Sequence, residues 1–135
     1  MTEPRDTQTL QRYIRWAELR CALVKLTNML PPDSIIYGIP RGGALVALLL
    51  SYLRDDLCVT DVLNRATVIV DDVIDSGRTM QTCLHHHYNF ARQRGATTAC
   101  LYQHQLAQVQ ADHHAEFIKD HDTWIIFPWD KGALF

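Results

Sequence analysis

Val68–Met80 reads VIVDDVIDSGRTM, and this stretch decides the fold. It opens with three β-branched residues, a run that suits a strand buried on both faces of a parallel sheet. Two carboxylates, Asp71 and Asp72, follow at the point where we expect that strand to end. A short polar loop comes next, and after it the apolar spacing becomes helical. A strand, a tight polar loop and a helix in this order let loop amides and a helix N-terminus converge on an anion.

The residues of this loop have the chemistry of a phosphate site. Gly77 has no Cβ, so the backbone can come close to a ligand, and Ser76 and Thr79 offer hydroxyl groups. The two carboxylates suit sugar hydroxyls, or a Mg²⁺ that a diphosphate brings with it. The alternative is an ordinary strand-to-helix turn with a Ser/Gly cap. Two adjacent Asp at the end of a buried strand have no packing rationale of their own, because unpaired charges are costly to bury.

Val68–Met80 closely resembles the phosphoribosyl-diphosphate (PRPP) binding motif of the type I phosphoribosyltransferases. That motif is a hydrophobic strand, two acidic residues and a loop ending in Thr-Gly-x-Thr or Ser-Gly-x-Thr. The resemblance implies that Asp71 and Asp72 hold ribose hydroxyls, with Asp72 also binding Mg²⁺, and that Asp75 accepts a proton at the base. These three carboxylates are the expected catalytic residues. The resemblance further implies that the 5′-phosphate is wrapped by Asp75, Ser76, Gly77, Arg78 and Thr79.

A second loop of similar chemistry lies earlier in the chain, at Pro40–Gly43. Gly42 and Gly43 stand between an expected strand and an expected helix, where backbone amides can face an anion. Arg41 adds a fork of donors suited to phosphate. Alone, this short pattern is equally compatible with a plain strand-to-helix turn. In the resembled family a similar segment is the pyrophosphate-binding loop, which often includes an unusual cis peptide.

The order of the expected elements predicts an α/β fold with a mostly parallel sheet flanked by helices. In such sheets ligands bind at the carboxyl ends of strands, which is where both candidate phosphate loops lie. The expected helices are Leu10–Leu30, Ala44–Arg54 and Gly77–Arg94, and the expected strands are Ser34–Ile39, Leu57–Thr60, Ala66–Val70, Thr98–Tyr102 and Thr123–Phe127.

The C-terminal stretch Asp122–Gly132, DTWIIFPWDKG, is rich in aromatic residues beside a polar turn. A planar base would stack well on such a ring, and the alternative is a last strand with core aromatics. The stretch resembles the C-terminal segment of bacterial xanthine-guanine phosphoribosyltransferases. That likeness implies that Trp124 stacks on a purine, that the backbone of Ile125 reads the base edge, and that Trp129 and Asp130 shape the pocket wall.

Two features depart from the resembled family. Its members carry a long mobile loop at the position of Asp61–Arg65, where this chain has only a short connection. A lid that excludes water protects a reactive sugar cation, so its absence makes slow or lost turnover an open alternative. The relatives also place a Lys where this chain has Gln103, His104 or Gln105. Any of the three can donate to a purine carbonyl, and we take His104 as the candidate.

Composition sets the wider limits. The 135 residues suffice for one domain, and a formal net charge of −2 gives no general affinity for nucleic acid. The four cysteines are scattered, and neither a membrane span nor a signal peptide is apparent, so we expect a cytoplasmic protein. We expect a single domain over residues 1–135, with 1–9 as a flexible tail and about 103–135 as a small base-binding hood.

The seven histidines do not predict a zinc site. His85–His87 are consecutive on an expected helix and point in different directions, and no pair shows the i, i+4 spacing of a helical metal site. Of the three, His87 is expected at the edge of the core. Asp55 and Asp56 are expected to be a solvated helix end.

These observations predict a Mg²⁺-dependent purine phosphoribosyltransferase that acts on PRPP and a 6-oxopurine in purine salvage. The family likeness also implies a homodimer or higher homo-oligomer. One alternative is a non-catalytic or weakly active PRPP- or nucleotide-binding regulatory protein on the same fold. Another is a different sugar-phosphate or nucleotide enzyme that shares only the central loop.

Overall fold

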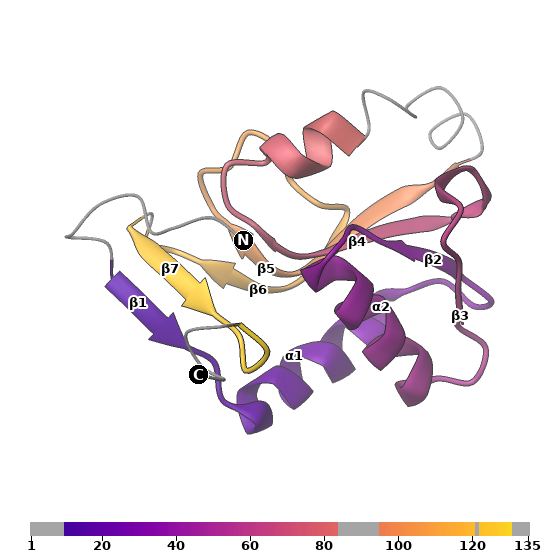
Figure 1. The fold of residues 1–135 in the computed structure, drawn as a ribbon, viewed down its shortest axis with the longest axis horizontal. Coiled ribbons are helices and arrows are strands. Elements are labelled where there is room, and N and C mark those ends of the chain that lie inside the picture. Colours follow the sequence, from indigo (N-terminus) through magenta and orange to yellow (C-terminus); the bar gives the residue numbers. More distant parts are fainter. Residues whose placement is uncertain (1–9, 84–94, 121, 131–135) are drawn as a thin grey trace.

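A five-stranded parallel sheet forms the centre of the molecule (Figure 1). The computed structural model describes residues 10–83, 95–120 and 122–130. The strand order is β3-β2-β4-β5-β6, and every neighbouring pair is parallel. The strands are β2 (Ile35–Gly38), β3 (Cys58–Val59), β4 (Val68–Ile74), β5 (Thr97–His104) and β6 (His113–Ile118). The predicted α/β class is confirmed.

Helices cover the two faces of this sheet. In Figure 1, α1 (Trp16–Met29) and α2 (Gly42–Leu53) lie together on one side, and a helix of residues 78–83 lies on the other. The side chains of successive β4 residues point alternately to the two faces of the sheet. Val68 and Val70 pack in the cluster that includes both long helices, whereas Ile69 packs in the cluster that includes Met80. A strand buried on both faces explains the continuous β-branched run of the sequence.

A second, two-stranded sheet joins the two ends of the described chain. Strand β1 (Leu10–Tyr13) pairs in parallel with β7 (Thr123–Ile126), with Leu10 opposite Thr123. The predicted helix Leu10–Leu30 is therefore wrong over its first residues. Pairing with a strand more than 100 residues away overrides the helical spacing of these residues. The helix instead begins at Trp16, and its N-terminus is capped by Glu18, whose side chain accepts a hydrogen bond from the Arg15 amide at 3.4 Å.

Several other predicted boundaries also differ from the structure. β4 continues through Asp71 and Asp72 to Ile74, β5 extends to His104, and α2 begins at Gly42. The strand β6 was not predicted from the sequence, and it takes part of the predicted hood region, about 103–135, into the main sheet. The predicted tail of residues 1–9 and the helical continuation over residues 84–94, including His85–His87, lie outside the described residues.

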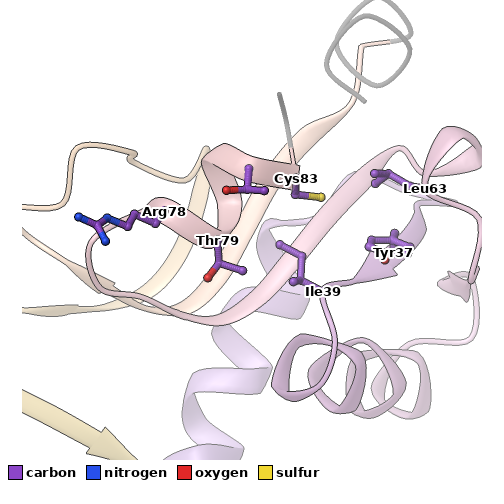
Figure 2. Close-up of a pocket in the computed structure, with 7 residues that line it drawn as sticks. Tyr37, Ile39, Leu63, Arg78, Thr79 and Cys83 are labelled. Atoms are coloured by element: carbon purple, nitrogen blue, oxygen red, sulfur yellow. The ribbon is translucent and has the colours of Figure 1, made fainter. Parts of the chain in front are cut away.

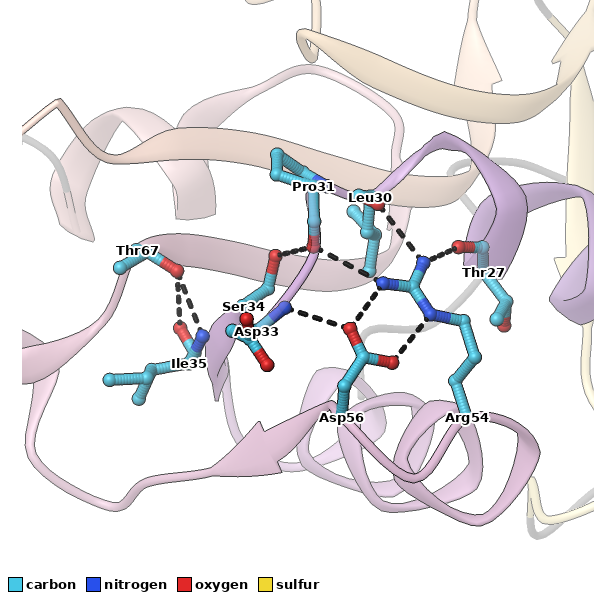
Figure 3. A network of polar contacts seen from close by, with 9 residues as sticks. All are labelled: Thr27, Leu30, Pro31, Asp33, Ser34, Ile35, Arg54, Asp56 and Thr67. Atoms are coloured by element: carbon cyan, nitrogen blue, oxygen red, sulfur yellow. Dashed lines mark hydrogen bonds and ion pairs between the residues drawn. The ribbon is translucent and has the colours of Figure 1, made fainter.

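Arg54 ties together the ends of the two long helices (Figure 3). Its Nη1 donates to the carbonyl oxygens of Thr27 and Leu30, at 2.6 and 3.0 Å. Its Nε and Nη2 donate to the two carboxylate oxygens of Asp56, at 2.8 and 2.7 Å, and Asp56 Oδ2 also accepts from the Asp33 amide at 2.8 Å. Asp56 is thus not the freely solvated helix end that the sequence suggested. Within the described residues, no helix is long and apolar enough to cross a membrane.

Candidate active site

The two adjacent carboxylates lie within the last part of β4, at the carboxyl edge of the sheet. Asp71 is 8% exposed and Asp72 is half-buried. Asp71 Oδ1 accepts from the Asp72 amide at 2.9 Å, and Asp72 Oδ1 accepts from the Val73 amide at 2.7 Å. Burial, reinforced by the neighbouring Asp72 charge, raises the pKa of Asp71 to about 9, and burial also raises the pKa of Asp72. Paired acids with raised pKa values are typical of functional sites.

These carboxylates suit a hard divalent cation. Mg²⁺ prefers oxygen ligands and is commonly held by one or two carboxylates together with substrate phosphates. The oxygens of Asp71 and Asp72 supply such ligands, and a cation beside them would favour the ionised form that burial disfavours. The donor set therefore fits Mg²⁺ brought by a diphosphate. Among the described residues no group of three or more His, Cys, Asp or Glu is placed to hold a metal ion.

The Pro40–Gly43 loop packs directly on the acid pair. A Cβ added to Gly42 would lie 1.9 Å from Asp72 Oδ2, and one added to Gly43 would lie 2.5 Å from the Val70 carbonyl oxygen. The peptide bond between Pro40 and Arg41 is cis. The structure thus brings together two loops that are about 30 residues apart, and it does so only because Gly42 and Gly43 have no side chains.

A third glycine, Gly38, allows this approach from the β2 side. A Cβ there would lie 2.2 Å from the Gly43 carbonyl oxygen, so α2 could not begin where it does. The sequence interpretation missed this residue. Its position at the end of a strand, shortly before two more glycines, was the available signal.

The loop from Asp75 to Thr79 turns the chain from β4 into the next helix. Gly77 has a φ of +89°, a conformation that residues with a Cβ adopt rarely. Ser76 Oγ accepts from the Arg78 amide at 3.3 Å, and helical geometry begins at Arg78. The amides at the N-terminus of this helix thus lie where the sequence predicts a phosphate-binding loop, and phosphate binding there stays a prediction.

A cleft of about 440 Å³ lies between the helix of residues 78–83 and the side chains of Tyr37, Ile39 and Leu63 (Figure 2). One end holds Ile39, the residue before Pro40, and Thr79, while Tyr37 and Leu63 lie at the other end. In Figure 2 the Arg78 guanidinium points away from the other residues shown. The cleft is lined by Tyr37, Ile39, Leu63, Arg78, Thr79, Thr82 and Cys83.

The candidate base-binding residues lie on the other side of Asp75. Asp75, Trp124 and Ile125 line a shared cavity of about 20 Å³, with Val73, Ile118 and Thr123. A cavity of that size holds about one water molecule, so a purine requires the walls to move apart. The structure therefore places Asp75 and Trp124 on the same small, closed slot.

Trp129 and Asp130 lie behind this slot. The Trp129 ring stacks on Phe127, with ring centroids 4.8 Å apart and 6° between the planes. Asp130 Oδ2 accepts from the Phe127 amide at 2.9 Å. These contacts fix the chain after β7. Trp129 and Asp130 thus stabilise the segment that follows the strand carrying Trp124.

The three residues considered in place of the family Lys have different surroundings. Gln103 is fully buried, donating to the His104 and Val109 carbonyls at 3.0 and 3.1 Å and accepting from the Ala111 amide at 2.9 Å. It holds the loop after β5 in place. His104 is 3% exposed, with Nε2 3.9 Å from Asp75 Oδ1. Gln105 is exposed and its amide donates to Ile118.

The connection between β3 and β4 is as short as the sequence suggested. Residues 60–67 contain one 3-10 turn, η1 (Leu63–Arg65), and Leu63 forms part of the cleft wall. The chain thus has a compact turn at the place where the resembled family carries its mobile lid.

Comparison with known proteins agrees with this architecture. Residues 57–135 match the model of the phosphoribosyl transferase domain. A xanthine-guanine phosphoribosyltransferase of Gluconobacter oxydans (strain 621H) is 36% identical over 70 residues, which are 50% of this chain and only 36% of the length of that curated relative.

Solved structures match over nearly the whole chain. A purine phosphoribosyltransferase from Pyrococcus horikoshii Ot3 is 26% identical with a TM-score of 0.71, over 90% of this chain and 94% of that one. A xanthine-guanine-hypoxanthine phosphoribosyltransferase of Helicobacter pylori has the same TM-score at 17% identity, over 90% and 95% of the chains. A hypothetical protein from Neisseria gonorrhoeae with bound ppGpp has a TM-score of 0.65 at 17% identity, over 93% and 92%. The chain belongs to the phosphoribosyltransferase family.

Proposed function

We propose that this protein is a Mg²⁺-dependent purine phosphoribosyltransferase. It transfers the 5-phosphoribosyl group of PRPP to a 6-oxopurine, namely xanthine, guanine or hypoxanthine, and releases pyrophosphate. The observation that carries the proposal is the contact of Gly42 and Gly43 with the end of β4, where two candidate anion-binding loops meet at a pair of adjacent carboxylates. A substrate with a phosphate at one end and a diphosphate at the other matches this spacing of groups.

Each group of residues binds a different part of PRPP. The hydroxyls of Ser76 and Thr79 and the loop amides from Asp75 to Thr79, with Arg78, hold the 5′-phosphate. Asp71 and Asp72 hold the ribose hydroxyls. Arg41, Gly42 and Gly43, at the N-terminus of α2, hold the pyrophosphate. These roles follow the pattern that the family likeness implies and agree with the positions of the residues.

The base enters the slot beside Asp75. Trp124 stacks on the purine, the Ile125 backbone reads its edge, and Asp75 accepts the proton that the base loses. Asp72 would hold Mg²⁺ together with the diphosphate, and the ion would supply positive charge near the leaving group. Because C1′ develops oxocarbenium character, placement and charge stabilisation by the residues named above account for most of the rate.

Incubation with PRPP and a panel of bases tests the proposal. Pyrophosphate release is expected with Mg²⁺ and at least one of hypoxanthine, guanine or xanthine, and not with adenine, uracil or orotate. An Asp71→Asn, Asp72→Asn double variant should lose Mg²⁺-dependent PRPP binding, whereas Trp124→Ala should lose base binding and keep PRPP binding. If no base in the panel releases pyrophosphate, the result would count against an enzyme.

A second candidate function is a non-catalytic PRPP- or nucleotide-binding regulator. The short connection over residues 60–67 favours it, since a lid normally shields the sugar cation from water. The similar Neisseria gonorrhoeae structure that holds ppGpp adds support for a nucleotide ligand on this fold. Saturable binding of PRPP or a nucleotide by calorimetry, without product from any base, would identify this function.

The proposal includes the wider expectations from the sequence. Residues 1–135 act as a single domain, with the region of about 103–135 as the base-binding hood. The active form is a homodimer or higher homo-oligomer in the cytoplasm. Analytical ultracentrifugation of the protein, with and without PRPP, tests the oligomeric state.

A further inference from the structure

His104 ends β5 directly behind Asp75. The imidazole is 3% exposed, and its Nε2 has no hydrogen-bond partner among the described residues. Nε2 lies 3.9 Å from Asp75 Oδ1. A buried polar nitrogen without a partner is costly, so its orientation toward a carboxylate calls for an explanation.

The geometry leaves one productive arrangement for the pair. A lone pair on Nε2 would repel the carboxylate, so the proton belongs on Nε2. At 3.9 Å this N–H is too far for a hydrogen bond, and a shift of about 1 Å would bring it to the usual 2.7–3.2 Å. Asp75 has room for this movement because its side chain is 26% exposed and borders the slot with Trp124. Bonds between catalytic groups commonly shorten when substrate binds.

The expected contact between His104 and the base does not fit this burial. Nε2 lies behind Asp75 and has less than 1 Å² of accessible surface. A base that stacks on Trp124 reaches Asp75 first, because Asp75, Trp124 and Ile125 line the slot and His104 does not.

We infer that His104 is a positioning residue, whose Nε2–H donates to the Asp75 carboxylate and fixes it toward the base. The hydrogen bond keeps the Asp75 carboxylate oriented to accept the base proton. The role of Asp75 in this inference rests on the proposed function. The pairing of the two side chains does not, and it can be tested separately.

Nuclear magnetic resonance of the protein labelled with ¹⁵N-histidine tests the pairing itself. The His104 ring is expected to carry its proton on Nε2, and its ring resonances should move in an Asp75→Asn variant. A proton on Nδ1 only, or resonances unchanged by Asp75→Asn, would overturn the inference whether or not the protein is an enzyme.

Steady-state kinetics tests the consequence. His104→Leu keeps a similar volume without a donor, and it should lower kcat by roughly 10- to 100-fold, with little change in KM for PRPP. His104→Gln places an amide N–H near the position of Nε2 and should recover most of the loss. In an Asp75→Asn background, His104→Leu should cause no further loss, because the residue acts through Asp75.

A purely structural role for His104 gives different results. The losses would multiply in the double variant, and His104→Gln would lower the melting temperature as much as His104→Leu. Either result would contradict positioning. If His104→Leu does not fold, the Gln variant and the spectra of the wild type and of Asp75→Asn still decide the question. If no base in the panel gives pyrophosphate release, the proposed function is wrong. The magnetic resonance test of the pairing between His104 and Asp75 still holds in that case.

Discussion

At the scale of single residues, two adjacent glycines have different tasks. Gly42 lies against a carboxylate that can rotate, while Gly43 lies against the backbone of β4. An alanine at position 42 therefore tests the ligand site, whereas an alanine at position 43 tests the stability of the fold.

Gly42→Ala should weaken Mg²⁺-dependent PRPP binding about tenfold with little loss of stability, because its methyl group displaces the Asp72 carboxylate while alanine favours the helix. Gly43→Ala meets the Val70 carbonyl at 2.5 Å and should lower the free energy of unfolding by about 1–3 kcal/mol. Calorimetry and urea unfolding measure the two effects. Equal loss of stability in both variants would contradict this division.

Gln103 is a residue whose importance only the structure shows. Gln103→Leu removes the partners of the Ala111 amide and the Val109 carbonyl, and it should lower the free energy of unfolding by about 1–3 kcal/mol. Hydrogen exchange in the loop after β5 should rise with it. Gln105→Leu, at an exposed neighbouring position, serves as the control and should change stability little.

At the scale of elements, Arg54 connects the ends of α1 and α2 by donating to the Thr27 and Leu30 carbonyl oxygens at the C-terminal end of α1. Arg54→Lys keeps the charge and loses the planar fork, so the melting temperature should fall. The exposed Arg20→Lys on α1 provides a matched substitution for comparison by calorimetry. An unchanged melting temperature for Arg54→Lys would show that the network is not stabilising.

The same network gives a pH dependence. The hydrogen bonds from Arg54 hold the pKa of Asp56 below its usual range. A carboxyl with a lowered folded-state pKa stabilises the fold above its unfolded pKa of about 4, and this stability is lost as the pH falls below that value. Unfolding scans from pH 6 to pH 3 should show a shallower decline for Asp56→Asn than for the wild type. Asp55→Asn, at the adjacent exposed position, should follow the wild type.

The elements also show what the sequence could predict. The meeting of Asp71 and Asp72 with Arg41–Gly43 was predictable, because the loops after neighbouring parallel strands share one edge of the sheet. The strand Leu10–Tyr13 was not, because its partner Thr123–Ile126 is distant in sequence and all four of its residues are exposed. β6 was missed for a similar reason, since HHAEFI has little apolar alternation and only its pairing with β5 makes it a strand.

At the scale of the whole molecule, the small sheet of β1 and β7 links residues Leu10–Tyr13 to the wall that carries Trp124. Gln11 lies opposite Trp124, and the amides of Leu10 and Ile14 donate to the Asp122 and Ile126 carbonyls at 3.0 and 2.9 Å. Base binding should therefore depend on a strand that does not itself touch the slot.

Deletion of residues 1–13 tests this dependence. Binding of guanosine 5′-monophosphate should weaken at least tenfold, because β7 loses its partner, whereas PRPP binding and the far-ultraviolet spectrum of the main sheet and helices should persist. Calorimetry with both ligands makes the comparison. Nucleotide binding equal to that of the full chain would show that β7 holds its position without β1.

The near-parallel stack of Phe127 on Trp129 has a practical consequence for following this end of the molecule. Rigid aromatic rings in fixed surroundings give near-ultraviolet circular dichroism bands, and these vanish when packing loosens even if secondary structure remains. The bands from this pair would thus act as an optical signal for the region behind the slot, separate from the backbone signal of the parallel sheet. A ligand that opens the slot should alter the first signal and leave the second unchanged.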